Sequence, residues 1–543
     1  MSEAPTRALP VPGEGPDGPD RPEFAYEPPT GTSPEVTRLM CLAAYLDAAF
    51  RRVVLARLVD DPRRVVAPSY GFDLVPVIAH CLRARDIDEE FSRKLTFARG
   101  VCLFTLTIIA VLLVVGWFDI VVRGRESALP LVVMVVVLLA LCARVGVHFL
   151  SGDTGRTAVE WAREVDVLFL PWLAWRDHRE RIKRILAREL SEETFTGGPP
   201  VPPSTKDGSL LRRVAREQHS ALIPYRLDSP FRGAGLELNM WSLALELRRR
   251  GAGTREEPGR PLDERAIVDL IRPQLESLTL SAAGGGRDRL GALEISECVF
   301  LPGTLPHGAL RSGLPVGAPD DARVAGHLRA AVAEGGEQRR HFLRIRVGGW
   351  DEQVVVTVFV RVHTQGGVLL LEIVPYLLAP LNDDFHVVSA VVEALTSGVD
   401  VDDVIDELMS RNAGIRKVLD VLSRTSKPGG SGRNSDDEDR RIRGPVFSVR
   451  QYAAGGGLSH FQRMDVIRYV KTIELRIAEG VNQALEQAGY ETEEFRRRAV
   501  HLGNGAVFIG GSMTGGAIST GSGSHAEDNS TDGSVSQSER GST

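Results

Sequence analysis

The sequence predicts an α-helical transmembrane hairpin joined to a cytoplasmic α+β domain with a mainly antiparallel sheet, then a long C-terminal helix and a short β-motif tail. Three observations support this fold class. Two apolar runs lie within residues 100–150, alternating and helix-like segments are mixed within residues 210–425, and an uncharged glycine-rich segment lies near the end. Because 543 residues exceed one ordinary hydrophobic core, several domains are expected.

The composition limits the possible functions. The formal net charge is −6, so the chain lacks the basic surplus of a nucleic-acid-binding protein and no nucleic-acid partner is expected. The five cysteines include no CxxC pair, so neither a zinc knuckle nor a disulfide framework is indicated. Residues 1–33 are rich in Pro and Gly without an apolar core. We therefore expect a disordered N-terminus and no signal peptide.

A helical cytoplasmic region is expected at residues 34–99, and a two-helix transmembrane hairpin at residues 100–150. Val101–Phe118 and Ala128–Ala143 contain no charge, and the second run continues to Leu150 past Arg144, which we place at the lipid headgroups. Arg and Lys flank the pair and are sparse in the loop between the runs, so both termini are predicted in the cytoplasm and the protein in the inner membrane, with the lipid bilayer as a partner. The alternative is a buried helical hairpin.

Residues 151–195 are interpreted as a juxtamembrane helix. The segment Val165–Leu186 begins apolar, contains Trp172 and Trp175, and then becomes strongly basic. Indole rings favour the depth of the headgroups, so these two residues are candidate membrane-interface residues together with Arg144. A helix packed in the core of a cytoplasmic domain fits the same pattern, and the sequence leaves both interpretations open.

A Pro-rich linker at residues 196–209 precedes the α+β domain at 210–425. The stretches "WSLALELRR", "LEISECVFL" and "HFLRIRV" alternate like strands, and a long hairpin turns near Gly366 and Gly367. Helical patterns lie between them, at residues 263–280, 320–334, 385–395 and 401–422. Mixed hairpins and helices of this kind favour an α+β fold with a mainly antiparallel sheet.

A disordered linker is expected at residues 426–444, and a long amphipathic helix within residues 445–500. In Phe461–Ala488 the apolar residues recur on one helical face. A single helix cannot bury such a face alone. It therefore packs on the α+β domain or pairs with a copy of itself.

No catalytic, cofactor-binding or metal-binding motif is found, so no cofactor is expected and an enzymatic activity is not favoured. "SPFRGAG" (Ser229–Gly235) has glycines spaced as in a phosphate loop but lacks the Lys-Ser/Thr of a P-loop, so a tight turn is predicted. His341, His363 and His386 lie near predicted element ends without the spacing of metal ligands. The acidic residues around Asp402 crowd a helix start, where the helix dipole favours them.

A glycine-rich β-motif is expected at residues 501–526, before a disordered tail at 527–543. Ala506–Gly511 and Ala517–Ser522 share a pattern at an offset of eleven residues, which suggests two short strand-like arms. Stacked against copies from other chains, such arms could satisfy their backbone groups and bury their apolar side chains. The candidate self-association residues are Val507, Phe508, Ile509, Ala517 and Ile518. A flexible low-complexity tail is the alternative.

Several stretches carry a resemblance that covers nearly the whole chain. "CLAAYLDAAFRRVVLARLV", "APSYGFDLVPV", "SPFRGAGLE", "WSLALELRR" and "GNGAVFIGGSMTGGAISTG" resemble an uncharacterised family of actinomycete membrane proteins with two spans. The last stretch is also similar to the C-terminal motifs of bacterial amyloid-signalling proteins. That similarity implies assembly with a partner that carries a similar motif.

The sequence therefore suggests a non-enzymatic, membrane-anchored scaffold or signalling protein. Its C-terminal motif would support a homo-oligomer or recruit a partner with a similar tail. The alternative is a membrane-tethered enzyme or small-ligand sensor that uses the domain at residues 210–425. Polar residues that converge in a concave pocket would support this alternative.

Overall fold

The computed structural model describes residues 26, 29, 32–60, 65–123, 170–200, 204–250, 262–280, 289–302, 322–334, 339–410 and 444–503. The helices are α1 (Pro34–Leu46), α2 (Ala48–Leu58), α3 (Leu74–Arg123), α6 (Leu170–Glu189), α7 (Thr205–Glu217), α8 (Glu264–Leu280), α10 (Ala322–Glu334), α11 (Asp383–Thr396), α12 (Asp402–Ser410), α15 (Val449–Ala453), α16 (His460–Gln487) and α17 (Glu493–Gly503), with a 3-10 turn at Arg289–Ala292. The strands are β1 (Leu222–Tyr225), β2 (Leu236–Glu237), β3 (Trp241–Glu246), β4 (Glu294–Pro302), β5 (Arg340–Gly349), β6 (Val354–Gln365) and β7 (Val368–Leu378).

The strands form one sheet in the order β1-β4-β5-β6-β7-β2, and β3 pairs with β7 beside β2. The β1–β4 pair is parallel and the other pairs are antiparallel. The predicted long hairpin is β6–β7, and its turn uses Gly366 and Gly367 at φ +60° and +79°, where a side chain would be strained. The mainly antiparallel α+β sheet predicted from alternation is therefore present.

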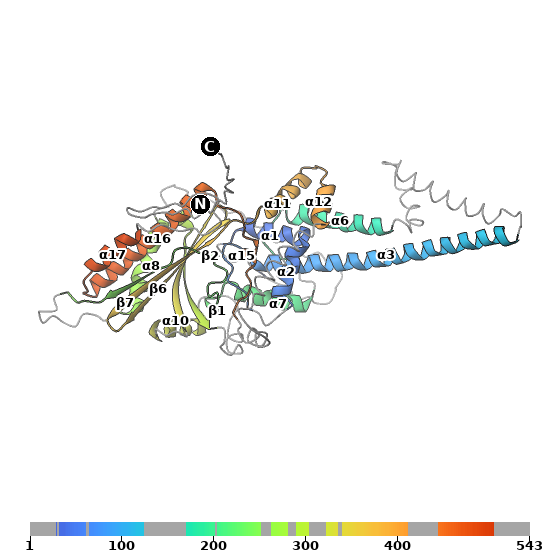
Figure 1. Cartoon of the computed structure of the whole chain (residues 1–543). Coiled ribbons are helices and arrows are strands. Elements are labelled where there is room, and N and C mark those ends of the chain that lie inside the picture. Colours follow the sequence, from blue (N-terminus) through green and yellow to red (C-terminus); the bar gives the residue numbers. More distant parts are fainter. Residues whose placement is uncertain are drawn as a thin grey trace, which may run out of the picture.

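Helices α8, α16 and α17 cover one face of this sheet (Figure 1). Ile267 and Ile271 of α8 and Ile473 and Ile477 of α16 are buried against strand residues of that face. At Gly480 a Cβ would lie 2.6 Å from the Cα of Ile271, so the two helices approach closely because this position is glycine. Of the two alternatives for the amphipathic helix, the structure has the one in which it packs on the α+β domain.

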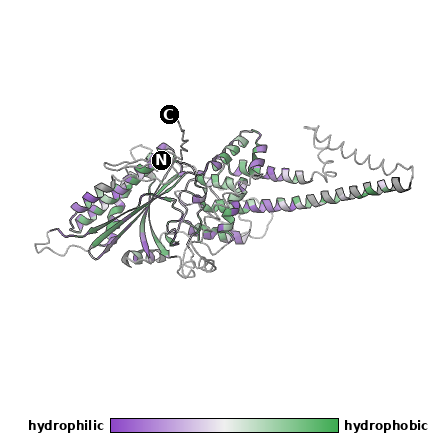
Figure 2. Cartoon of the chain, in the orientation of Figure 1, coloured by the Kyte–Doolittle hydropathy of each residue, from purple (hydrophilic) through white to green (hydrophobic). Residues whose placement is uncertain are grey.

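A second body of helices lies beside the sheet, and we call it the helical layer (Figure 1). It consists of α1, α2, the first part of α3, α6, α7, α11, α12 and α15, which share one hydrophobic core. The side chain of Asp47 accepts hydrogen bonds from the backbone N–H groups of Ala49 and Phe50 and so begins α2 directly after α1. Phe50 meets Phe385 of α11 edge to face at 5.5 Å. Figure 2 shows hydrophobic strands and, on α16 and α17, an alternation of hydrophilic and hydrophobic residues.

The predicted membrane hairpin requires correction. Among the residues that the structure describes, no helix is long and apolar enough to cross a membrane. The predicted hairpin at residues 100–150 is therefore wrong, and so is the predicted multi-pass location in the inner membrane with cytoplasmic termini. The sequence argument treated Val101–Phe118 as a separate span, whereas this run is the far part of α3, one helix of 50 residues whose first part packs in the helical layer. The second run, Ala128–Ala143, lies outside the described residues.

Candidate functional site

The candidate site is the junction between the sheet and the helical layer. It is built on the sheet face opposite α8 and α16. Because side chains alternate along a strand, Phe342, Arg344 and Arg346 of β5 lie on this face, while Leu343 and Ile345 face α8 and α16. The junction therefore receives one aromatic ring and two arginines from this strand.

A cluster of five aromatic rings, which we call the aromatic plug, fills the first part of the junction. The ring of Phe231, from the loop between β1 and β2, lies 4.9, 5.4, 4.7 and 5.1 Å from the rings of Phe300, Phe342, Phe359 and Tyr376. These centroid distances and tilted geometries are favourable for aromatic side chains. The plug fixes the loop against four neighbouring strands of the sheet.

The segment "SPFRGAG" that carries Phe231 is a tight turn, as predicted. Gly233 and Gly235 have φ values of +107° and +105°, which favour glycine. A Cβ at Gly235 would lie 2.1 Å from the carbonyl oxygen of Leu377. The glycine spacing thus serves the close approach of two backbones and does not form a phosphate loop.

The two arginines of β5 occupy the second part of the junction. Arg346 is buried, and its guanidinium donates to Glu294 at 2.5 and 2.9 Å and to Glu352 at 2.8 Å. Arg344 donates through Nε to the Ser296 hydroxyl at 2.9 Å, and its guanidinium lies 5.5 Å from the ring centre of Tyr70. Buried guanidinium groups need such partners, because an unpaired charge away from water is costly.

The turn between β5 and β6 has an unusual backbone. Trp350, Asp351 and Glu352 have φ values of 55°, 55° and 62°. The left-handed region costs roughly 1–2 kcal/mol for each residue that carries a Cβ. The turn directs the Glu352 carboxylate back over Gly348, where a Cβ would collide with it, and onto Arg346. The ion pair and the missing Cβ offset part of the strain.

Arg450 of α15 joins the helical layer to this turn. Its side chain is fully buried, and Nη2 donates to the carbonyl oxygen of Gln353 at 2.9 Å and reaches that of Glu352 at 3.5 Å. Burial lowers the pKa of Arg450 to about 10. Within the part of the chain that the structure describes, its Nε and Nη1 groups find no hydrogen-bond partner. Arg450 therefore binds two backbone carbonyls of the strained turn, and its burial with two N–H groups that lack a partner among the described residues is unfavourable to stability.

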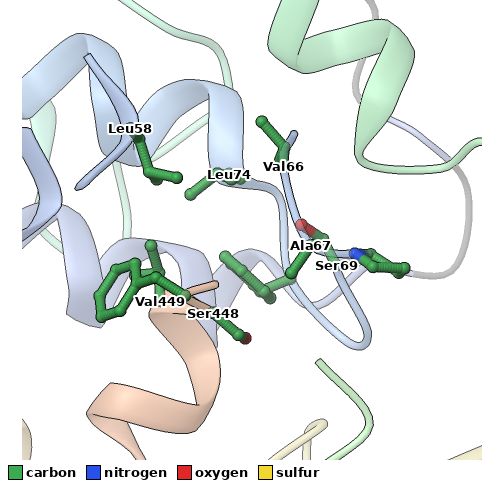
Figure 3. Close-up of a pocket in the computed structure, with 10 residues that line it drawn as sticks. Leu58, Val66, Ala67, Ser69, Leu74, Ser448 and Val449 are labelled. Atoms are coloured by element: carbon green, nitrogen blue, oxygen red, sulfur yellow. The ribbon is translucent and has the colours of Figure 1, made fainter. Parts of the chain in front are cut away.

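A small pocket lies in the helical layer close to this junction (Figure 3). It encloses about 190 Å³, including the part open to solvent, and its lining is mainly apolar. The labelled lining residues come from the end of α2, the segment before α3, the first residue of α3 and the start of α15: Leu58, Val66, Ala67, Ser69, Leu74, Ser448 and Val449. Its interior is too narrow for a small-molecule ligand, and most of its lining residues are apolar.

A buried polar network fixes the start of α3. Asp73 accepts hydrogen bonds from the Tyr26 hydroxyl at 2.6 Å and from Gln218 at 3.0 Å, and the Leu74 N–H donates to Gln218 Oε1 at 2.9 Å. Burial raises the pKa of Asp73. Both carboxylate oxygens have partners, so the group is a structural anchor and not a free general base.

The histidines near strand ends pair with carboxylates. Glu297 contacts His341 at 3.0 Å, Arg265 at 2.8 Å and Arg272 at 2.6 Å. The hydrogen bond from His341, and then the Arg265 guanidinium, hold the pKa of Glu297 down to about 2. His363 likewise contacts Glu264. Across the described ranges, no group of three or more His, Cys, Asp or Glu side chains is placed to hold a metal ion.

The sequence-predicted site residues are not brought together with the junction. Val507, Phe508, Ile509, Ala517, Ile518 and Arg144 lie outside the described residues. Trp172 is 44% exposed, with the guanidinium of Arg176 5.0 Å from its ring, and Trp175 is half-buried under Arg179 at 4.5 Å.

The remainder of α6 packs inside the helical layer. His178 stacks on Phe91 at 4.3 Å, and Ile182 and Leu186 are buried. For this part of the segment, the structure has the packed helix that was the alternative to an interfacial helix.

Sequence reasoning did not identify Arg344, Arg346 and Arg450. One signal was available for the first two, because "HFLRIRV" places two arginines at alternate positions of a strand whose remaining residues are mostly apolar. Such a pattern puts both charges on one face of the sheet. Arg450 gave no comparable signal, since an arginine in a short helix is usually exposed.

Comparison with known proteins gives one match. Residues 240–517 match the AbeC-like domain, and this range begins just before β3 and ends within the glycine-rich segment. No curated protein and no solved structure matches the chain. The match lends no support to a membrane or signalling role. Since it covers about half of the chain, the protein belongs to the AbeC-like domain family.

Proposed function

We propose that this protein is a non-enzymatic scaffold in which the sheet and the helical layer present a C-terminal self-association segment at residues 501–526. One observation carries the proposal: the carboxylates described at the junction are engaged by guanidinium, hydroxyl or amide donors of the same chain. Arg346 is held by Glu294 and Glu352, and Asp73 by Tyr26 and Gln218.

The same observation disfavours the enzyme or ligand-sensor alternative. A catalytic acid or base needs access to a substrate as well as a suitable pKa. The carboxylates of the junction are occupied by guanidinium, hydroxyl or amide donors, and the neighbouring pocket of about 190 Å³ is mainly apolar. A body whose carboxylates are already engaged in this way suits the presentation of a segment for association between chains.

The segment itself supports association between chains. From Gly503 to Ser524 it has no charged residue, so copies stacked in register would not repel each other. Val507, Ile509 and Ile518 are the apolar β-branched residues of the two arms. The similarity to bacterial amyloid-signalling motifs favours the same mode, in which the partner is another copy or a protein with a similar tail.

Sedimentation of the full chain over a range of concentrations tests the proposal. We expect oligomers of the wild-type chain, and we expect their loss in a Val507→Asp/Ile518→Asp double variant. A Ser534→Asp/Ser536→Asp variant adds the same charge beyond the motif and should assemble like the wild type. A wild-type chain that stays monomeric throughout, or a double variant that assembles equally well, would contradict the proposal.

A further inference from the structure

An open sheet edge lies where the described chain ends. β2 and β3 both pair with β7 on one side, and in the described part of the chain no strand pairs with their other side. Leu236 and Met240 on this stretch are 49% and 54% exposed. An unpaired edge with exposed apolar side chains is a template for another strand.

Helix α17 leads the chain to this edge. The Glu491 N–H donates to the Arg248 carbonyl at 2.8 Å, and seven residues later Arg498 donates to the Ala244 carbonyl at 2.9 Å. The chain thus runs back along β3 toward its start. Gly503, where α17 ends, comes five residues after Arg498 and about 7.5 Å further along the helix. It is therefore expected beside Trp241.

The backbone groups on this edge point outward. The Ala244 carbonyl is reached by Arg498, so it faces away from β7. In a strand the N–H of a residue points to the same side as its carbonyl, and residues alternate, so the backbone of Ser242 also faces outward. An incoming strand would supply hydrogen-bond acceptors and donors for these outward backbone groups.

We propose that Ala506–Gly510 of the same chain adds to this edge as an antiparallel strand along residues 236–242. The sequence "AVFIG" has the apolar, β-branched and aromatic composition of a strand and would cover Leu236 and Met240. Only two residues separate Gly503 from Ala506, and a tether this short gives an effective concentration in the millimolar range. The chain's own segment therefore outcompetes that of a second copy.

The extent of the family match agrees with this placement. The match starts at residue 240, at the β3 edge, and continues past Ala506–Gly510 to residue 517. The first arm thus belongs to the same domain as the sheet. This inference rests on the proposed function only for the role of the segment in association between chains. The sheet would hold the first arm, and assembly between chains would require release of that arm from the sheet.

Hydrogen exchange tests the docking. In the full chain the outward-facing amides of residues 236–242, such as that of Ser242, should exchange at least tenfold more slowly than in a chain that ends at Gly503, while amides of the central strand β5 should be unchanged. A second arm uses an oxidised Met240→Cys/Phe508→Cys double variant, which should give a monomer with an internal disulfide. A Met240→Cys/Ser536→Cys variant is the matched control and should not cross-link efficiently.

The outcomes separate this inference from the proposed function. Equal exchange in both chains, or no cross-link at residue 508, overturns the docking whether or not the chain self-associates. A further result also overturns the docking. It is that a chain with only the first cysteine and a chain with only the second form disulfide-linked dimers, while the double variant forms no internal disulfide. The segment then occupies another copy. Slow exchange with an internal disulfide in a chain that never oligomerises supports the docking and removes the proposed scaffold function.

Discussion

His80 should make the folded state sensitive to acid. It is buried in α3, and its Nδ1 lies 2.9 Å from the Tyr45 hydroxyl. Burial, and then the positive charge of Arg83, lower its pKa from 6.5 to about 3. The folded state thus keeps this imidazole neutral at a pH where the unfolded chain binds a proton. Stability from this group is complete above pH 6.5 and is lost as the pH falls toward 3.

The size of the effect follows from the two pKa values. At pH 4.5 the unfolded histidine is largely protonated and the folded one is neutral. The pH lies two units below the unfolded value of 6.5, and each unit corresponds to about 1.4 kcal/mol. The free energy of unfolding should therefore fall by about 2–3 kcal/mol between pH 7 and pH 4.5 on account of His80 alone.

Urea unfolding at the two pH values, followed by far-UV circular dichroism, measures this difference. A His80→Gln variant cannot bind the proton, so its loss of stability on acidification should be smaller than that of the wild type by the amount given above. His386 on α11 is exposed, and a His386→Gln variant is the control that should behave like the wild type. Equal acid sensitivity of the wild type and the His80→Gln variant would refute the reasoning.

Three further substitutions test the packing, each by urea unfolding. Phe231→Ala removes the aromatic plug and should cost about 3–4 kcal/mol, whereas Leu227→Ala, at a side chain that is 81% exposed, should stay within ~0.5 kcal/mol. Gly235→Ala meets the Leu377 carbonyl and should cost about 2 kcal/mol or more, unlike Gly457→Ala, where a Cβ meets open space. Glu297→Gln should cost about 2–3 kcal/mol at pH 7, and the difference from the wild type should vanish as the pH falls from 4.5 toward 2.

Local sequence patterns predicted where the strands lie but not which strands pair with each other. The alternation in "HFLRIRV" identifies a strand and its two faces, because burial has a period of two. It contains no information on which strand lies alongside. Trp241–Glu246 pairs with Val368–Ile373, over a hundred residues away, and β1 joins β4 in parallel across α8. These pairings depend on the whole topology and could not be inferred from local periodicity.

The helical layer shows the same limit. The sequence analysis treated residues 34–99, 385–422 and 445–500 as parts of different regions. The structure brings Phe50, Phe385 and Tyr452 into contact within one core. Periodicity indicates that each helix has an apolar face, but it does not say which other helix covers that face.

The sequence analysis also missed the junction because of the backbone conformation of the turn between β5 and β6. A turn with three consecutive left-handed residues would be expected to contain glycines, and "WDE" contains none. Its conformation is maintained from outside, by Arg346 on the Glu352 side chain and by Arg450 on the two carbonyls. Each of these groups is costly alone, the turn because of strain and Arg450 because of burial.

Together, the strained turn and the buried arginine stabilise a link between the sheet and the helical layer. Because the Glu352 carboxylate of that link is engaged by Arg346, it offers little to a ligand, and recognition by this chain is expected at its exposed sheet edge. Under our docking proposal, the uncharged segment after Gly503 adds to the unpaired side of β2 and β3. A strand that finds its backbone partners within its own chain is not available for stacking. The competition between these two uses of one short segment would then control when the protein assembles.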